Sequence, residues 1–234
     1  MEQGPSVPPA DRPGSAPAVL PQGSLCSSPE PAFGVIHEAL GAELEAHGLA
    51  VVPGFLSPAE VGLLRSCAAA TRAGGRFRPA GVGRGPSFRI RPEVRGDEVY
   101  WLDAGRDGHA VSAWMARMEG LRAAINARLF LGLFGYEAHF SHYPPGASYQ
   151  IHLDRFADAP LRTLSVVLYL NRNWRSGDDG RLRIYLERAG CRPWRDVMPA
   201  GGTLVAFLSD RFPHEVLPAA RSRWSLTGWF TRRP

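Results

Sequence analysis

The second half of the chain consists of short apolar or alternating segments separated by turn residues. Residues 136–143 and 149–153 are two such segments, and Pro144-Pro145-Gly146 separates them. Others follow at residues 163–171, 181–186, 203–208 and 225–232. Many short strands punctuated in this way are typical of an antiparallel sandwich or barrel. We therefore expect a mainly β fold with helices, whose core is a double-stranded β-helix, or jelly roll.

The first half of the chain is expected to support that core, chiefly with helices. Helical or strand-like patterns occur at residues 36–44, 49–52, 98–102 and 110–131. A further helix should begin at Pro58, because Ser57 is suited to the N-cap and Glu60 can complete a capping box. The stretch from residue 73 to about 87 is rich in glycine and arginine and is expected to be a loop.

The first 32 residues have a different composition from the rest of the chain. Eight Pro, five Ser and three Gly make up half of this segment. Such a segment buries too little apolar surface to offset the entropy of ordering it, so we expect a disordered Pro-rich tail at residues 1–32. One domain should follow at residues 33–234, with its support at 33–131 and its jelly-roll core at 132–234.

The charged residues limit the kinds of partner. All 27 basic residues are arginines, and the formal net charge is +5. They are spread along the chain and do not form the run of about 5–8 that marks a nucleic-acid-binding patch, which disfavours a nucleic-acid partner. An anchor for a substrate carboxylate would have to be an arginine, which binds carboxylates through a planar fork.

The cysteines and the apolar segments indicate a compartment. Cys26, Cys67 and Cys191 are odd in number and far apart in sequence, which fits a reducing compartment better than a disulfide framework or a zinc site. No segment approaches the ~20 apolar residues of a membrane span, and the N-terminus lacks the features of a signal peptide. We expect a cytoplasmic location and no membrane contact.

Three residues form a candidate metal site. His152 and Asp154 are two positions apart, so on a strand both side chains point to the same face. His214 would be the third ligand, just before another expected strand. Two histidines and one carboxylate leave open positions on the metal, as in non-haem Fe(II) oxygenases, whereas structural zinc favours a closed tetrahedral site. The His-x-Asp pair by itself also fits ordinary packed or exposed side chains.

Two other residues add to the metal interpretation. Arg223 lies nine residues after His214 and can face the same cavity from the next strand. There it would bind the distal carboxylate of a co-substrate, and Tyr169 would donate a hydrogen bond to it. Tyr169 by itself also fits an ordinary core position. Several polar groups converging inside a small barrel would be too costly unless they shared a ligand.

Five stretches of the sequence carry a specific resemblance. They are YPPGASYQIHLDRF, RTLSVVLYLNRNW, GRLRIYL, GTLVAFLSDRFPHEVLPA and SRWSLTGWF. In order and spacing they resemble the oxygen-sensing prolyl hydroxylases, a family of Fe(II)- and 2-oxoglutarate-dependent oxygenases that includes the hypoxia-sensing prolyl 4-hydroxylases of animals and their bacterial relatives. The similarity extends from about residue 56 to 230 and is best over 143–230.

The resemblance implies a role for each matched residue. Iron would be bound by His152, Asp154 and His214. Arg223 and Tyr169 would bind the C5 carboxylate of 2-oxoglutarate, and Tyr143 and Tyr149 would line the pocket.

The resemblance also implies a substrate loop. Residues 91–101 (RPEVRGDEVYW) resemble the loop that covers a protein substrate in this family. Arg95 and Asp97 belong to this loop, and our hypothesis is that Asp97 pairs with Arg162. One departure lies elsewhere, because Asp179 stands where relatives commonly have the first glycine of a pair.

The implied activity is dioxygenation of a prolyl residue in a protein, with consumption of O₂ and 2-oxoglutarate and release of succinate and CO₂. Ascorbate would keep the iron ferrous. The same chemistry on a free amino acid or another small molecule is an alternative, and a catalytically silent binding or sensing module is a weaker one. Repair of alkylated nucleic acid is disfavoured, since the repair enzymes have a second arginine where this chain has Trp229.

Overall fold

The computed structural model describes residues 30–83, 85, 88–155, 161–187 and 193–233. The predicted tail lies outside these residues except at its end, because helix α1 (Glu30–His47) begins at Glu30. Two other helices are α2 (Pro58–Ala73) and α3 (His109–Leu129), and a short 3₁₀ turn, η2, covers Ser176–Asp178. All three helical predictions are thus confirmed, with boundaries that differ by a few residues.

The capping box predicted at the start of α2 is present. The Ser57 hydroxyl accepts a hydrogen bond from the backbone N–H of Glu60, and the Glu60 carboxylate accepts one from the backbone N–H of Ser57. Pro58 occupies the first turn, where its missing N–H removes no helical hydrogen bond. Local sequence alone therefore determines where this helix begins.

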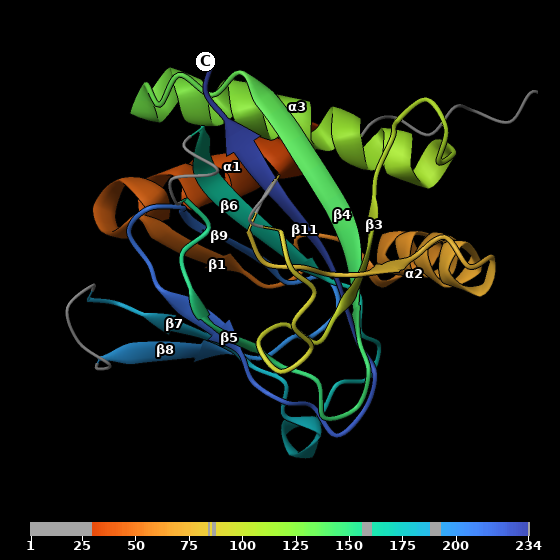
Figure 1. Cartoon of the computed structure of the whole chain (residues 1–234). Helices are drawn as coiled ribbons and strands as arrows, with labels where there is room; N and C mark the ends of the chain where they lie inside the picture. Colours follow the sequence, from red (N-terminus) through yellow and green to blue (C-terminus); the bar gives the residue numbers. More distant parts are fainter. Residues whose placement is uncertain (1–29, 84, 86–87, 156–160, 188–192, 234) are drawn as a thin grey trace, which may run out of the picture.

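The described strands form two antiparallel sheets (Figure 1). In spatial order, the large sheet contains β1 (Leu49–Val52), β9 (Leu204–Leu208), β6 (Arg162–Tyr169), β11 (Arg223–Thr231), β4 (Gly135–Tyr143), β3 (Glu98–Trp101) and β2 (Arg78–Pro79). The small sheet contains β5 (Tyr149–His152), β10 (His214–Val216), β7 (Leu182–Tyr185) and β8 (Trp194–Val197). Two facing antiparallel sheets with flanking helices confirm the predicted jelly-roll class.

Three of these strands were not predicted. β2 has only two residues and lies within the stretch expected to be a loop, where it pairs with β3. β8 has the sequence WRDV, which lacks an apolar alternation, and it pairs only with β7 among the described strands. β10 has three residues, too few for a recognisable period, and His214 is its first residue rather than the residue before a strand.

Strand β6 shows how the large sheet separates two cores. All its residues are buried, and side chains on a strand alternate between the two faces. Leu164, Val166 and Leu168 pack in the cluster that includes the three helices. Val167 and Tyr169 pack in the cluster shared with the small sheet. Helices α1 and α3 therefore cover one face of the large sheet, and the small sheet covers the other (Figure 1).

Candidate active site

The three predicted metal ligands come together between the sheets. β10 pairs with β5 so that His214 lies directly opposite His152, and Asp154 follows β5 after one residue. The Nε2 atoms of His152 and His214 lie 3.8 Å and 3.6 Å from the carboxylate oxygens of Asp154. One ligand atom from each residue lies within 4.8 Å of the others. These distances are suited to three ligands on one side of a single metal ion.

The backbone fixes both imidazoles in the orientation that a metal requires. Nδ1 of His152 lies 2.8 Å from the carbonyl of Gln150, and Nδ1 of His214 lies 3.0 Å from that of Phe212. A carbonyl oxygen only accepts, so each Nδ1 is the donor and each Nε2 presents its lone pair. Burial, together with the neighbouring His214, lowers the pKa of His152 to about 3, so its imidazole is neutral at pH 7.

Asp154 is oriented by two buried serines. The Ser165 hydroxyl donates to Oδ2 of Asp154 at 2.6 Å, and the Ser165 and Ser209 hydroxyls lie 2.9 Å apart. Burial by itself raises the pKa of Asp154, but His214, His152 and the Ser165 hydrogen bond together lower it to about 2. Asp154 is therefore ionised at neutral pH and ready to bind a cation.

Arg223 and Tyr169 form a buried cationic pocket on neighbouring strands of the large sheet. Arg223 is 1% exposed, and its guanidinium lies 5.2 Å from the centroid of the Tyr169 ring. Its Nε donates to the carbonyl of Gly180 at 2.9 Å, but no carboxylate of the described residues pairs with it. The Tyr169 hydroxyl is buried beside this guanidinium, and its proton has no acceptor among the same residues. A buried cation beside an unsatisfied donor fits an anionic ligand.

Tyr143 and Tyr149 occupy the predicted positions at the pocket. Tyr143 is buried, with its ring centroid 5.1 Å from the Arg223 guanidinium. The Tyr149 ring stacks on the imidazole of His152, with centroids 3.6 Å apart and an angle of 15° between the planes. Burial raises the pKa of both phenols, so each keeps its proton at neutral pH. Both rings thus face the metal site or the cationic pocket.

The predicted substrate loop lies against β5, the strand that ends with the candidate ligand His152. Gly96 N–H donates to Ser148, and Gln150 N–H donates to Val94, so the loop is hydrogen-bonded alongside β5. Within the loop, Arg95 donates to both carboxylate oxygens of Asp97, at 2.7 Å and 3.2 Å. These contacts place the loop beside the ligands.

The ion pairs at this loop differ from our hypothesis. Arg162 bonds to Glu137 at 2.8 Å and lies 3.5 Å from the centroid of the Trp229 ring. Asp97 is instead bonded to Arg95, two residues away on the same loop. Both residues of the hypothetical Asp97–Arg162 pair thus have another ion-pair partner, and their pairing with each other stays a prediction.

A cavity of about 520 Å³ connects these groups. Its walls include the three candidate ligands, Arg223 and the aromatic residues Trp101 and Trp229. The polar side chains that enter it from the large sheet are on one face, since Arg223, Ser225 and Thr227 alternate along β11. The cavity is large enough for a small anion at Arg223 and part of a second ligand nearer its mouth.

Comparisons with known proteins agree with this geometry. The family model described as the 2OG-Fe(II) oxygenase superfamily matches residues 138–231. The crystal structure of a Pseudomonas putida prolyl-4-hydroxylase is 43% identical, with a TM-score of 0.75, and the match covers 85% of this chain and 100% of that one. The chain belongs to the 2OG-Fe(II) oxygenase superfamily, among its prolyl hydroxylases.

Two further comparisons extend to animals. A Trichoplax adhaerens prolyl hydroxylase, solved with a peptide fragment of the oxygen degradation domain of hypoxia inducible factor, is 25% identical with a TM-score of 0.78, over 86% of this chain and 91% of that chain. Egl nine homolog 1 of Homo sapiens is 28% identical over 95% of this chain and 53% of its own length. This oxygenase thus spans about half the length of that curated relative. In the described part of the chain, no helix is both long and apolar enough to cross a membrane.

Sequence reasoning about the oxygenase missed two residues that position the site. Ser165 is a polar residue within the apolar strand sequence TLSVVLYL, and that exception was the available signal. Gly180, with a backbone φ of +71°, presents its carbonyl to Arg223. Its role depends on a contact across 43 residues of sequence, which no local pattern reveals.

Proposed function

We propose that this oxygenase hydroxylates prolyl residues of a polypeptide, consuming O₂ and 2-oxoglutarate and releasing succinate and CO₂. The observation that carries the proposal is the buried Arg223 guanidinium, which has no carboxylate partner among the described residues and lines the same cavity as a two-histidine, one-carboxylate cluster, with Tyr169 beside it. Such a combination fits a metal ion together with a carboxylate of the co-substrate, the ligand set named in the family description 2OG-Fe(II) oxygenase.

Fe(II) would be held by His152, Asp154 and His214, whose ligand atoms leave the opposite side of the ion open. When bound, the iron supplies the redox chemistry that couples decarboxylation of 2-oxoglutarate to oxidation of a C–H bond. The protein orients both imidazoles through their Nδ1 hydrogen bonds, burial lowers the pKa of His152 so that its imidazole is neutral, and the Ser165 hydrogen bond helps to keep Asp154 ionised. Fixed orientations of this kind favour metal binding, because the ligand side chains lose little conformational entropy when the metal binds.

The C5 carboxylate of 2-oxoglutarate would be bound by Arg223 and Tyr169. Nε of Arg223 is already bonded to Gly180, so the guanidinium is oriented and its terminal nitrogens are available. The Tyr169 hydroxyl keeps its proton, because burial raises its pKa to about 12 despite the opposing effect of Arg223. The hydroxyl can therefore donate a hydrogen bond to a bound carboxylate, and it does not compete with that carboxylate for Arg223 as a phenolate would.

A polypeptide substrate is supported by two kinds of observation. The Pseudomonas putida relative is a prolyl-4-hydroxylase, and the Trichoplax adhaerens relative was solved with a peptide. The side of the cavity away from Arg223 is aromatic, with Trp101 46% exposed. Partly exposed aromatic rings offer an apolar surface for a proline ring and also exclude water from the reacting atoms.

The proposal also includes a location and a reductant for the iron. A cytoplasmic location follows from the odd number and wide spacing of the cysteines, of which the described Cys67 is free. Ascorbate as a reductant of the iron follows from the resemblance to the family.

The co-substrate part is tested by titrating 2-oxoglutarate into the Fe(II)-loaded protein without oxygen, and then admitting air and measuring succinate. We expect a metal-to-ligand absorption band in the wild type. His152→Ala should lack the band, whereas His139→Gln, which changes another histidine of the cavity wall, should keep it. Arg223→Lys should raise the KM for 2-oxoglutarate about tenfold, because the ammonium cannot reproduce the fork. A wild type that binds Fe(II) but forms no band would refute the proposal.

The substrate part is tested by mass spectrometry. Proline-containing proteins and free proline would each be incubated with the complete system and searched for one added oxygen. Oxygen on a prolyl residue within a polypeptide, dependent on 2-oxoglutarate, would support the proposal. Oxygen on free proline alone would favour the small-molecule alternative. Band formation and uncoupled succinate release, by contrast, would be the same under either alternative.

A further inference from the structure

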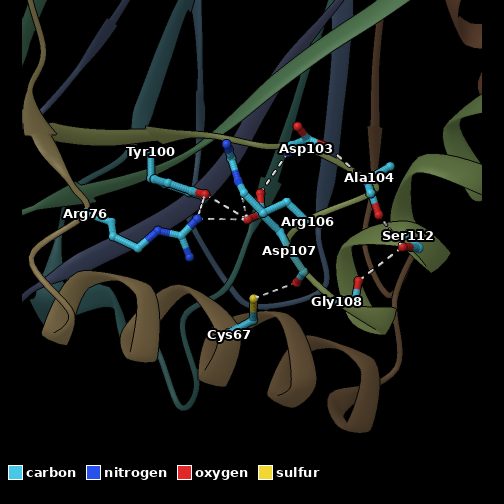
Figure 2. Close-up of polar contacts among 10 residues, drawn as sticks. Cys67, Arg76, Tyr100, Asp103, Ala104, Arg106, Asp107, Gly108 and Ser112 are labelled. Atoms are coloured by element: carbon cyan, nitrogen blue, oxygen red, sulfur yellow. Dashed lines mark hydrogen bonds and ion pairs between the residues drawn. The ribbon is translucent and has the colours of Figure 1, made fainter.

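Outside the candidate metal site, one buried carboxylate accepts hydrogen bonds from four groups at the edge of the same cavity (Figure 2). It belongs to Asp107, whose side chain is 2% exposed. Oδ1 accepts from the Tyr100 hydroxyl at 2.7 Å, from Arg76 at 3.1 Å and from Arg106 at 3.5 Å. Oδ2 accepts from the backbone N–H of Asp103 at 2.8 Å.

The segment that carries Asp107 is fixed from several sides. The Cys67 thiol of α2 donates to the Asp107 carbonyl at 3.6 Å. The Ser112 hydroxyl of α3 lies 2.8 Å from the carbonyl of Ala104, and Asp103 accepts from the backbone of Gly105. These contacts tie the turn between β3 and α3 to both helices (Figure 2). The carboxylate is therefore held in place independently of any ligand.

The groups bound to Asp107 are arranged around one phenol ring. The guanidinium carbons of Arg76 and Arg106 lie 4.4 Å and 5.8 Å from the centroid of the Tyr100 ring. Arg76 also bonds to the Tyr100 hydroxyl. Burial and the Asp107 carboxylate raise the pKa of Tyr100, so its hydroxyl stays a donor to Asp107. Asp107 thus determines where both guanidinium groups lie.

This wall of the cavity has more positive than negative charge. Arg76 and Arg106 share the single carboxylate of Asp107. Arg78 lies on the same wall, and its guanidinium donates to the backbone carbonyls of Gly75 and Phe77. The Arg76 and Arg106 side chains are 44% and 58% exposed, so part of each remains accessible. All three arginines line the cavity that contains the metal cluster.

We propose that Arg76, Arg78 and Arg106 form a subsite for an acidic side chain of the polypeptide substrate, and that Asp107 is the positioning residue that sets its location. The inference rests on the proposed function and adds a specificity to it. A carboxylate of the substrate, near its target proline, would offset part of the excess positive charge on this wall of the cavity. Because Asp107 holds the guanidinium groups in place, a carboxylate should be preferred at one distance along the peptide from the target proline.

The test uses fluorescent peptides that contain one proline and a single Glu, placed at successive positions on either side of it. Each peptide has a Gln analogue. Anisotropy would be measured on the Fe(II)- and 2-oxoglutarate-loaded protein without oxygen. We expect Glu to improve binding about fivefold over Gln at one position, a modest effect because exposed ion pairs contribute little each. The preference should decrease as salt is raised.

Three variants separate the subsite from general charge effects. The double variant Arg76→Gln, Arg106→Gln should bring Glu and Gln peptides within about twofold. Arg128→Gln is the matched control, since Arg128 pairs with Glu45 and is not part of the cavity wall. Asp107→Asn should keep a general preference for acidic peptides but lose its dependence on position. A merely structural role for Asp107 would lower the thermal stability and leave the positional profile unchanged.

Failure of this inference is distinguishable from failure of the proposed function. A protein that forms the 2-oxoglutarate absorption band but binds Glu and Gln peptides equally at every position would overturn the subsite alone. Equal losses in Arg128→Gln and in the double variant would overturn it too. A protein that forms no band would instead refute the proposed function, whatever the peptides do.

Discussion

Removing the Ser165 hydroxyl should weaken metal binding, although it leaves all three candidate metal ligands unchanged. The hydroxyl donates to Oδ2 of Asp154 at 2.6 Å, and Ser165 is 0% exposed, so water cannot readily replace it. A hydrogen bond to a charged group contributes about 1.5–3 kcal/mol. Loss of an outer partner of a metal ligand typically costs about 10–100-fold in affinity. The two magnitudes agree, so Ser165→Ala should bind Fe(II) about 10–100-fold more weakly.

The assay is an anaerobic Fe(II) titration in competition with a chelator of known affinity. Ser141→Ala is the matched control, because Ser141 is also buried and lines the cavity, but its hydroxyl bonds to His139 at 3.0 Å and not to the metal cluster. At saturating Fe(II), the KM of Ser165→Ala for 2-oxoglutarate should match the wild type, since Arg223 is unchanged. An Fe(II) affinity of folded Ser165→Ala within about threefold of the wild type would refute the argument from outer-partner hydrogen bonding.

Other substitutions test separate parts of the structure. Tyr169→Phe should raise the KM for 2-oxoglutarate about 5–10-fold in steady-state assays, because one hydrogen bond to a charged group is lost; an unchanged KM would place the carboxylate elsewhere. Gly180→Ala should raise the same KM and lower the melting temperature, since an added Cβ would lie 2.7 Å from Ala219 and 3.4 Å from Arg223 at a φ of +71°; a normal KM would show that Arg223 adapts. Ser57→Ala should reduce the free energy of unfolding by about 1 kcal/mol in urea, through loss of the N-cap, with Ser176→Ala as a control. Asp107 has a folded-state pKa below its ordinary value, because its hydrogen bonds and Arg76 outweigh burial; its contribution is thus present above the unfolded pKa near 4 and lost as pH falls through the folded one. The stability gap between wild type and Asp107→Asn should therefore shrink on acidification below about pH 4, and a constant gap would contradict the charge argument.

The sequence determined the elements whose causes are local. The capping residues at Ser57 and Glu60 mark the start of α2. The two-residue spacing of His152 and Asp154 predicted that both side chains reach one site, and they do, although the strand ends at His152. The alternating segments predicted most of the large sheet and the fold class. The spacing also made His214 and Arg223 candidates for the third ligand and the carboxylate anchor. The resemblance to a known family then favoured these roles over ordinary core positions.

Only the tertiary structure decided which distant residues meet. The alternation of side chains along a strand predicts which residues share a face, but it does not predict which other strands or helices will pack against that face. The pairing of His214 with His152, the contact of Ser165 with Asp154 and the ion pair of Asp97 with Arg95 all depend on how strands and loops pack. The same holds for Asp107, whose partners come from separate elements. Partner choice is set by the packing of the whole domain, and a sequence pattern contains only its local part.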